Sequence, residues 1–483
     1  MSDEREERLK HLDELKKLGV EPFGNRFDGA QPIRPIVEKY GPETEGKPFT
    51  VAGRITGHRS FGKATFLDLR DWTGKIQVYV KKDAVGEPAH VWFQHVGIGD
   101  LIAARGTLGK TKTGEVSIFA TELTLLTKAL RPLPEKWHGL KDAEVRYRKR
   151  YLDLIANPEV LQTFLKRAKA LTLIRRFLDA RGYVEVETPM MQAIPGGAAA
   201  RPFVTHHNTL DRDLYLRIAL EIPLKKLMVG GVERVYEVGR VFRNEGIDSN
   251  HNPEFTLLEL YHAYGNLGTM MELTETLVAH LAMEVAGTTK LSYGERVIDV
   301  TPPWPRKDYH ELLKEHAGVD GSSDDALRAK LREKHVETGG LSHIDLVDKV
   351  FGEYVDPHLV NATFVCAQPI EMTPLCREIK GRPGIADRFE AFAAGMELAN
   401  AYTELNDPMV QRERLARQAG GAGDEMMKTG KVDEDFLAAL EHGMPPAGGL
   451  GIGIDRLVMF LTNSPSIREV ILFPLLRETA SDS

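Results

Sequence analysis

Residues 234–264 combine arginines, carboxylates and a histidine with two apolar runs, which is typical of a phosphate-binding pocket. Residues 232–243 are rich in Val, Tyr and Phe and favour a strand. Loop-forming Asn, Gly, Asp, Ser and Pro follow, and the chain then extends again. At the period of a strand, Phe255, Glu259 and Tyr261 share one face. Surface salt bridges would explain an isolated pair of charges, but so many charges beside apolar strands indicate a site.

A second group of polar side chains lies in the run R-F-E-A-F-A-A-G-M-E-L-A-N-A-Y-T-E. Strand alternation places Asn400, Tyr402 and Glu404 on one face, with Glu390 on the preceding strand and Glu397 after a turn. Carboxylates among apolar neighbours are costly to bury unless a cation pairs with them. The pattern therefore favours a bound metal or ammonium group over the alternative, a solvated edge strand.

Near the C-terminus, the run A-G-G-L-G-I-G-I-D-R joins closely spaced glycines to the start of a helix. Glycines at 449, 451 and 453 would let a flat ligand approach the backbone, and the helix N-terminus at Asp455 and Arg456 favours phosphate. A dinucleotide-binding fold is excluded, because neither the spacing nor the position of these glycines fits it.

These three segments resemble those of a known family. The run F-R-N-E-G-I-D-x-x-H-N-P-E-F-T closely resembles motif 2 of the class II aminoacyl-tRNA synthetases, specifically of the lysyl enzymes. The helix, glycine and strand that end in Y-V-E-V-E-T-P resemble motif 1, and the glycine-rich run resembles motif 3. The resemblance covers nearly the whole chain.

The resemblance implies ATP-dependent activation of L-lysine and its transfer to the 3′ end of tRNA(Lys). Catalytic roles are implied for Arg243 and Arg456. The implied ATP contacts are Arg243, Glu245, His251, Phe255, Glu397 and Arg456. The implied lysine contacts are Gly197, Glu221, Glu259, Tyr261, Asn400, Tyr402 and Glu404. Magnesium is expected at Glu390 and Glu397, and a homodimer interface is expected to include Pro189.

Four positions depart from the pattern of many bacterial relatives. Asn250 stands where arginine is common, Tyr402 where phenylalanine is common, and Ala401 where glycine is common; Pro223 is also unusual. None of them removes a charge that the reaction needs.

Five short apolar runs between residues 50 and 120 predict a small Greek-key barrel. Alternation places Phe66 on its outer face and also points Gln77 and Tyr79 outward. An exposed aromatic suits an unstacked base, although it can equally be an ordinary surface residue. The segment resembles the OB-fold anticodon domain of lysyl- and aspartyl-type synthetases. This resemblance implies anticodon contacts by Arg54, Phe66, Gln77 and Glu115.

The predicted fold class is α+β, an antiparallel-sheet class II synthetase catalytic domain preceded by a β-barrel OB-fold domain and an N-terminal helix. The predicted boundaries are an N-terminal helical extension at 1–45, the OB-fold at 46–130, a basic hinge at 131–156 and the catalytic domain at 157–483, with a helical insertion at about 265–360.

Composition indicates a soluble globular protein, with 42% hydrophobic and 28% charged residues and a net charge of −7. The charged N-terminus has no secretory signal, and no apolar run could span a membrane, so a cytoplasmic location is expected. The two cysteines, Cys366 and Cys376, match neither a metal motif nor a disulfide framework.

Three other activities are compatible with these residues. A related enzyme could lysylate a protein, although such enzymes typically lack the barrel. An RNA-binding regulator without ligase activity would not need Arg243, Glu390, Glu397 and Arg456. Synthesis of dinucleoside polyphosphates from the adenylate could coexist with tRNA charging.

Overall fold

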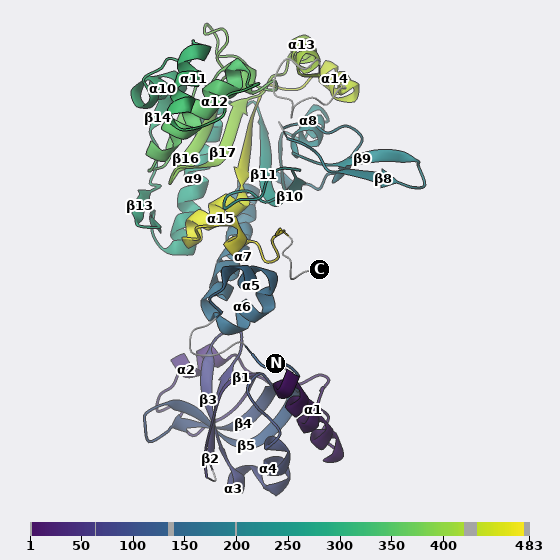
Figure 1. The fold of residues 1–483 in the computed structure, drawn as a ribbon, viewed down its shortest axis with the longest axis vertical. Coiled ribbons are helices and arrows are strands. Elements are labelled where there is room, and N and C mark those ends of the chain that lie inside the picture. The colour runs from purple at the N-terminus through teal and green to yellow at the C-terminus, as the bar shows by residue number, and fades with distance from the viewer. Residues whose placement is uncertain (1, 63, 134–139, 199, 420–431, 478–483) are drawn as a thin grey trace. The chain divides into compact units, whose positions relative to one another are not determined.

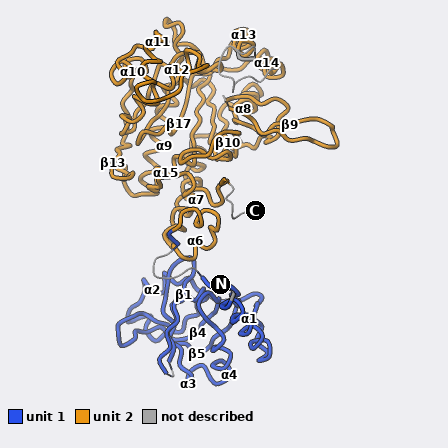
Figure 2. Tube along the Cα trace, viewed as in Figure 1, with its two compact units in different colours: residues 1–141 blue, residues 142–483 orange. Residues whose placement is uncertain are grey.

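The structure is a computed structural model that describes residues 2–62, 64–133, 140–198, 200–419 and 432–477. The chain forms two compact units, Met1–Lys141 and Asp142–Ser483 (Figure 2). The division falls inside the predicted hinge, residues 131–156, of which residues 134–139 lie outside the described part. The N-terminal helical segment and the barrel belong to one unit, and each unit has its own core.

The first unit contains a closed five-stranded barrel with the strand order β1-β2-β3-β5-β4 (Figure 1). Its strands are β1 (Pro48–Phe61), β2 (Ala64–Arg70), β3 (Lys75–Lys81), β4 (Leu101–Lys110) and β5 (Val116–Thr127). Alternate side chains such as Ile55, Leu67 and Val78 are fully buried and fill the barrel. The predicted barrel is confirmed, because apolar residues recur at the period that points them inward.

Helix α1 (Ser2–Lys17) packs on this unit through Leu12 and Leu15, which are both buried. Leu15 belongs to the same core as the barrel residues, so the predicted N-terminal helix is confirmed and packs against the barrel. The other helices of the unit are α2 (Ile33–Glu38), α3 (Lys82–Val85) and α4 (Glu87–Phe93).

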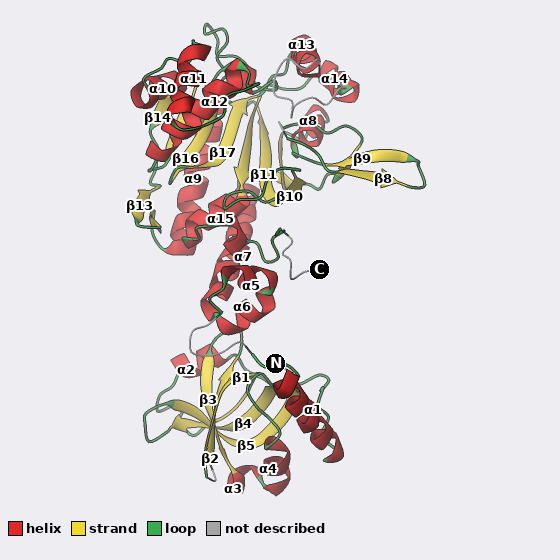
Figure 3. Ribbon diagram, in the orientation of Figure 1, coloured by secondary structure: helices red, strands yellow, loops and turns green. Residues whose placement is uncertain are grey.

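The second unit is built on an eight-stranded sheet of order β14-β15-β16-β17-β18-β11-β10-β6 (Figure 3). Its strands are β6 (Val184–Glu185), β10 (Arg234–Phe242), β11 (Glu254–Ala263), β14 (Arg306–Asp308), β15 (Thr363–Cys366), β16 (Arg388–Ala393), β17 (Met396–Thr403) and β18 (Ala447–Gly453). Among the described strands of this sheet, only the outermost pairs, β14 with β15 and β10 with β6, are parallel. The predicted antiparallel α+β fold is confirmed. Two smaller sheets contain β7 (Met191–Gln192), β8 (Val204–His207), β9 (Arg212–Leu216), β12 (Lys290–Tyr293) and β13 (Arg296–Asp299).

The two faces of the sheet pack against different helices. Leu258 and Leu260 point toward the main core, which also contains residues of α7 (Pro158–Asp179), α9 (Leu267–Ala286) and α15 (Ile454–Thr462). Tyr261 points to the opposite face and packs with Leu224 of α8 (Glu221–Val229). Because successive side chains of a strand alternate, one strand serves both the core and the face that carries α8.

The predicted insertion at about 265–360 is too long. Helix α9 buries Met270, Leu277 and Leu281 in the main core, so it belongs to the catalytic fold. The helical addition is smaller and comprises α10 (Tyr309–Ala317), α11 (Asp324–Glu333) and α12 (His343–Tyr354), which share a core with Val365 and Phe392. Helices α13 (Pro408–Ala419) and α14 (Glu434–Glu441) follow β17 along the chain.

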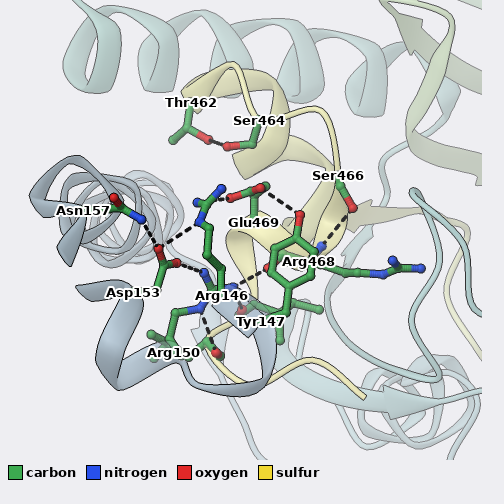
Figure 4. Close-up of polar contacts among 12 residues, drawn as sticks. Arg146, Tyr147, Arg150, Asp153, Asn157, Thr462, Ser464, Ser466, Arg468 and Glu469 are labelled. Carbon is green, nitrogen blue, oxygen red and sulfur yellow. Dashed lines mark hydrogen bonds and ion pairs between the residues drawn. The ribbon is translucent and has the colours of Figure 1, made fainter. Parts of the chain in front are cut away.

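The C-terminal part of the predicted hinge forms α5 (Ala143–Arg148) and α6 (Arg150–Ala156), which are anchored to α16 (Ile467–Val470) (Figure 4). Arg150 pairs with Asp153 at 2.5 Å, and both side chains are fully buried. Arg150 also donates to the carbonyl oxygen of Arg468 at 2.7 Å, and the Tyr147 hydroxyl donates to Glu469 at 2.8 Å. Residues 142–156 are therefore an integral part of the second unit and not a free connector.

Candidate active site

A cleft of about 340 Å³ opens on the sheet face that carries α8. Its walls come from β11, β17 and β18, the loop between β10 and β11, and the first residues of α8 and α15. The residues predicted for ATP and lysine all line it: Gly197, Glu221, Arg243, Glu245, His251, Phe255, Glu259, Tyr261, Glu397, Asn400, Tyr402, Glu404 and Arg456. Glu390 lines a neighbouring cavity of about 320 Å³, to which Glu397 also contributes.

The register of three strands brings these side chains together. Strand β18 lies between β11 and β17, and its Gly451 pairs with Glu259 on one side and Asn400 on the other. Gly449 likewise pairs with Tyr261 and Tyr402. Since these β18 residues have no side chains, those of both neighbouring strands can meet above them.

Two glycines are required by close approaches within the site. A Cβ at Gly449 would lie 1.8 Å from Glu404 Oε1 and 2.7 Å from Tyr261 Cε1. Gly449 was expected to let a ligand approach the backbone. In the structure, its missing side chain makes room for the carboxylate of Glu404. Gly197 has a φ of 87°, and a Cβ there would lie 3.0 Å from the Cβ of Ala219. A larger residue would be strained there by its backbone as well as by its neighbours.

Three carboxylates form one end of the cleft. Glu221, Glu259 and Glu404 are 4%, 6% and 1% exposed. Tyr402 donates from its hydroxyl to both oxygens of Glu221 at 2.8 Å, so the tyrosine at this position adds a polar contact. The backbone N–H of Leu220 donates to Glu259 at 3.1 Å, and Glu404 Oε1 has no hydrogen-bond partner among the described residues. This end of the cleft is suited to a ligand cation.

Burial controls the titration of this acidic end. Burial raises the pKa of Glu259 to about 8, and the charge of Glu221 raises it further in the same direction. Burial likewise raises the pKa of Glu404 to about 8, although the ammonium of Lys225 opposes the change. A ligand cation would lower both values, because it stabilises the ionised carboxylates.

Lys225 is a residue of the acidic end that the sequence interpretation missed. Its Nζ lies 2.5 Å from Glu221 Oε1 and 2.5 Å from Glu404 Oε2, and its side chain is fully buried. The contact with Glu404 is an ion pair without the alignment of a hydrogen bond. The spacing of four residues between Glu221 and Lys225 on a helix was the available signal.

The opposite end of the cleft is basic and polar. The guanidinium of Arg243 lies 5.2 Å from the centroid of the Phe255 ring. Arg456 Nη1 lies 3.3 Å from Glu397 Oε2, and its Nη2 lies 2.9 Å from His251 Nε2. His251 is held from its other ring nitrogen by Asp248 at 2.9 Å. Burial lowers the pKa of Arg243, against the opposing effect of nearby carboxylates.

Asp455, by contrast, has a structural role. It is 1% exposed, accepts from the backbone N–H of Thr256 at 2.6 Å and pairs with Arg167 at 2.6 Å. This carboxylate attaches the start of α15 to β11 and α7, and it thereby positions the adjacent Arg456.

Arg388 organises the neighbouring cavity. It pairs with Glu390 and donates from Nε to Asn400 Oδ1 at 3.0 Å. Burial raises the pKa of Glu390 to about 7 against the opposing charge of Arg388. Among the described residues, no three His, Cys, Asp or Glu side chains are grouped so that they could hold a metal ion alone.

Comparison with known proteins agrees with this geometry. Residues 142–477 match the family profile of tRNA synthetases class II (D, K and N), and residues 49–126 match that of the OB-fold nucleic acid binding domain. The lysine–tRNA ligase of Moorella thermoacetica is 52% identical over 476 residues, which are 97% of each chain. This chain belongs to the lysine–tRNA ligase family of class II tRNA synthetases. The lysine–tRNA ligase of Pelotomaculum thermopropionicum is 51% identical, and the match covers 97% of this chain and 94% of that protein. The lysine–tRNA ligase of Halalkalibacterium halodurans is 50% identical, and the match covers 98% of this chain and 97% of that protein.

In this synthetase, the predicted anticodon residues lie on the barrel or beside it. Phe66 is half-buried and stacks on Tyr79 with ring centroids 4.7 Å apart. Gln77 points to the outer face as predicted, since its neighbours Ile76 and Val78 fill the barrel, but it is only 9% exposed and accepts from the Ser117 hydroxyl at 2.9 Å. Its low exposure has a local reason, because Ser117 of β5 is its direct register partner. Arg54 donates to the carbonyl oxygen of Gly99 at 2.7 Å, and Glu115 is exposed.

Pro189, the two cysteines and the helices complete the comparison with the predictions made for this synthetase. Pro189 is exposed and follows Thr188, whose hydroxyl donates to the buried Glu237 at 2.7 Å. Both cysteines are free; Cys376 is buried and Cys366 is half-buried. None of the helices in the described ranges is both long and apolar enough to cross a membrane.

Proposed function

We propose that this protein activates L-lysine with ATP and transfers the lysyl group to tRNA(Lys). The observation that carries the proposal is the acidic end of the cleft, where Glu221, Glu259 and Glu404 converge. Glu404 Oε1 is a buried carboxylate oxygen without a partner among the described residues, and the ε-ammonium of lysine would supply one. The two tyrosines beside it, Tyr261 and Tyr402, would cover the aliphatic part of the side chain.

The charge of this end separates lysine from the other substrates of the matched profile, which covers D, K and N. An aspartate ligand would place its carboxylate against three buried carboxylates of the protein, a like-charge contact that costs several kcal/mol (about 2–5 by order of magnitude). A neutral asparagine would leave those carboxylates without a cation.

Arg243, Arg456 and His251 would serve the first chemical step. A carboxylate oxygen of lysine attacks the α-phosphorus of ATP in line, the bond to the β-phosphate oxygen breaks, and pyrophosphate leaves. Arg243 would stabilise the charge that develops on the α-phosphate, and His251 with Arg456 would hold the outer phosphates. Glu245 and Phe255 would bind the adenine by hydrogen bonding and stacking.

Glu390 and Glu397 fit a magnesium ion bound together with the substrate. Magnesium commonly uses one or two protein carboxylates and completes its coordination with phosphates and water. Two acidic side chains on adjacent strands, β16 and β17, beside the outer-phosphate site meet that need. When bound, the ion would neutralise phosphate charge.

The second step transfers the lysyl group to tRNA. A hydroxyl of the terminal adenosine attacks the carbonyl carbon of lysyl-adenylate, and AMP leaves. Positioning and electrostatics support this step, because the leaving phosphate is already a good leaving group. Arg54, Phe66, Gln77 and Glu115 would contact the anticodon, with Phe66 and Tyr79 as the stacking surface.

A panel of amino acids in ATP–pyrophosphate exchange tests the proposal. Lysine should support exchange, and aspartate and asparagine should not. Exchange with another amino acid but not with lysine would contradict the substrate assignment. Exchange with lysine but no charging of tRNA(Lys) would contradict the second step alone.

The assembly and the location of the protein are further proposals. We propose a homodimer whose interface includes the exposed Pro189, and sedimentation of the purified protein would test it. We also propose a cytoplasmic location, where its substrates tRNA and ATP are found; cell fractionation would test it.

A further inference from the structure

Lys225 is a fully buried lysine that no step of the proposed reaction uses. It lies on α8 four residues after Glu221, with Nζ 2.5 Å from Glu221 Oε1 and 2.5 Å from Glu404 Oε2. An ammonium group is buried this completely only when counterions accompany it, so these two carboxylates are its partners.

The surroundings of Lys225 separate it from any ligand. The described residues that line the cleft include Glu221 and Glu404 but not Lys225. The rings of Tyr261 and Tyr402 have their centroids 5.9 Å and 5.6 Å from Nζ. Lys225 therefore acts on a ligand only through the two carboxylates that it contacts.

The acidic end of the cleft, here called the wall, consists of Glu221, Glu259 and Glu404 with Lys225 behind them. Its charges match the ammonium groups of lysine. Glu221, Glu259 and Glu404 can together carry three negative charges, and Lys225 carries one positive charge, which leaves two negative charges. Free lysine brings two ammonium groups. Without Lys225, carboxylates buried this closely would take up protons more readily, and a neutral carboxyl group pairs weakly with an ammonium group.

The other titratable groups beside Lys225 stay uncharged near neutral pH. Burial raises the pKa of Tyr261 and of Tyr402 well above that of an ordinary tyrosine. Burial also raises the pKa of Cys376, which forms a β-bridge with Glu404. Burial alone would lower the pKa of Lys225, but the charges of its carboxylate partners raise it instead. The charge of the wall thus depends on Lys225 and the three glutamates.

We propose that Lys225 is a specificity-determining positioning residue, which keeps Glu221 and Glu404 ionisable and aligned for the ammonium groups of lysine. This inference rests on the proposed function, because it takes lysine as the ligand of the cleft. Its consequence is that the wall binds a diammonium substrate near neutral pH. A wall without Lys225 would prefer a neutral hydroxyl or amide.

The test is lysine-dependent ATP–pyrophosphate exchange by the unaltered protein, Lys225→Met and Lys225→Arg, from about pH 6.5 to 9. We expect Lys225→Met to raise the KM for lysine about tenfold near pH 7 and to change the KM for ATP less than about twofold, because a pKa increase of one unit alters the ionised fraction about tenfold. The KM for lysine should recover as the pH rises. Lys225→Arg, which keeps the charge, should retain the pH profile of the unaltered protein.

A KM for lysine that rises equally at every pH, or together with the KM for ATP, would make Lys225 a purely structural residue and overturn the proposal. A Lys225→Arg profile shifted like that of Lys225→Met would overturn it too. If Lys225→Met does not fold, Lys225→Gln takes its place in the test. The glutamine amide can still donate to a carboxylate, which helps the fold, but it carries no charge, so the same change in the KM for lysine is expected. Failure of the unaltered protein to exchange with lysine would instead contradict the proposed function.

Discussion

At the scale of single residues, the cleft is defined by opposite charges at its two ends. Glu221, Glu259 and Glu404 make one end acidic, whereas Arg243 and Arg456 make the other basic. A ligand with cationic groups at one end and phosphates at the other matches this polarity, because a buried charge needs an opposite charge near it.

Glu404→Gln should weaken the binding of lysine. The change should raise the KM for lysine about 10- to 100-fold in the exchange reaction, because a hydrogen bond to a charged group contributes about 1.5–3 kcal/mol. The KM for ATP should stay nearly constant. Glu245→Gln, at the ATP end of the same cleft, is the matched control and should show the reverse pattern. Equal effects of Glu404→Gln on both KM values would contradict the assignment of the two ends.

Binding of lysine should release protons near pH 7. Burial raises the pKa of Glu259 and of Glu404 to about 8, so both carboxyl groups hold protons below that pH in the empty cleft. Raised carboxyl pKa values stabilise the empty fold at low pH, and this contribution is lost as the pH rises through about 8. Lysine favours the ionised forms, so proton release should be large at pH 7 and small above about pH 8. Calorimetry in buffers of different ionisation enthalpy measures it, and a heat independent of the buffer would refute it.

At the scale of elements, β18 decides how the side chains of β11 and β17 meet. Because its glycines have no side chains, other groups can occupy the space above the strand. Above Gly449, that space is occupied by the side chains of Glu404 and Tyr261. A methyl group there must displace one of them, because protein interiors are close-packed.

Gly449→Ala should therefore impair lysine binding more than Gly451→Ala. A Cβ at 449 would lie 1.8 Å from Glu404 Oε1, whereas the nearest atom to a Cβ at 451 is 3.8 Å away. We expect Gly449→Ala to lower the free energy of unfolding by about 1–3 kcal/mol, the usual cost of overpacking, and to raise the KM for lysine. Chemical denaturation and exchange kinetics measure the two effects. Similar behaviour of both variants would show that the register of β18 does not govern the site.

The anchoring of α5 and α6 to α16 makes a separate prediction about stability. Arg150→Met should lower the free energy of unfolding of the second unit by about 1–3 kcal/mol, because it removes one of the two arginine partners of the buried Asp153, which keeps Arg146, and takes a donor from the carbonyl oxygen of Arg468. The double variant Arg150→Met/Asp153→Leu should recover part of the loss. Hydrogen exchange followed separately for the strands of the second unit and for those of the barrel would distinguish the two units. An unchanged denaturation midpoint for Arg150→Met would contradict the role of this ion pair.

At the scale of the whole molecule, the proposed roles divide between the two units. The residues assigned to ATP and lysine lie in Asp142–Ser483, and those assigned to the anticodon lie in Met1–Lys141. Each unit has a core of its own, so a change on the barrel surface can affect tRNA without affecting the activation of lysine.

Phe66→Ala should raise the KM for tRNA(Lys) in the charging reaction about 5- to 100-fold, because stacking of a base on an aromatic ring contributes about 1–3 kcal/mol. Exchange of pyrophosphate into ATP without tRNA should be unchanged. The matched control for loss of a barrel aromatic is Phe119→Ala, because the Phe119 ring packs edge-on against Tyr79, on which Phe66 stacks, with centroids 5.3 Å apart. A fall in the exchange rate of Phe66→Ala would contradict this division of labour.

Much of the site was predictable because strand periodicity and motif spacing are local. The shared faces of Phe255, Glu259 and Tyr261, and of Asn400, Tyr402 and Glu404, follow from alternation along single strands, and the structure confirms that all of these residues line the cleft. The barrel was predictable for the same reason. The extent of the insertion was predicted wrongly, although α9 is more apolar than α10, α11 and α12, which is typical of a helix buried in the main core.

The sequence by itself determined which residue types line the cleft, since the motifs that contain Arg243 and Glu259 are contiguous runs along the chain. Only the tertiary structure decided what supports them. Lys225 behind Glu221 and Glu404, Gly449 beneath Glu404, and the burial of Gln77 under Ser117 each depend on segments that are distant in sequence. The physical reason is that burial and counterion placement are properties of packing, and packing is set by the whole sheet and not by any one strand.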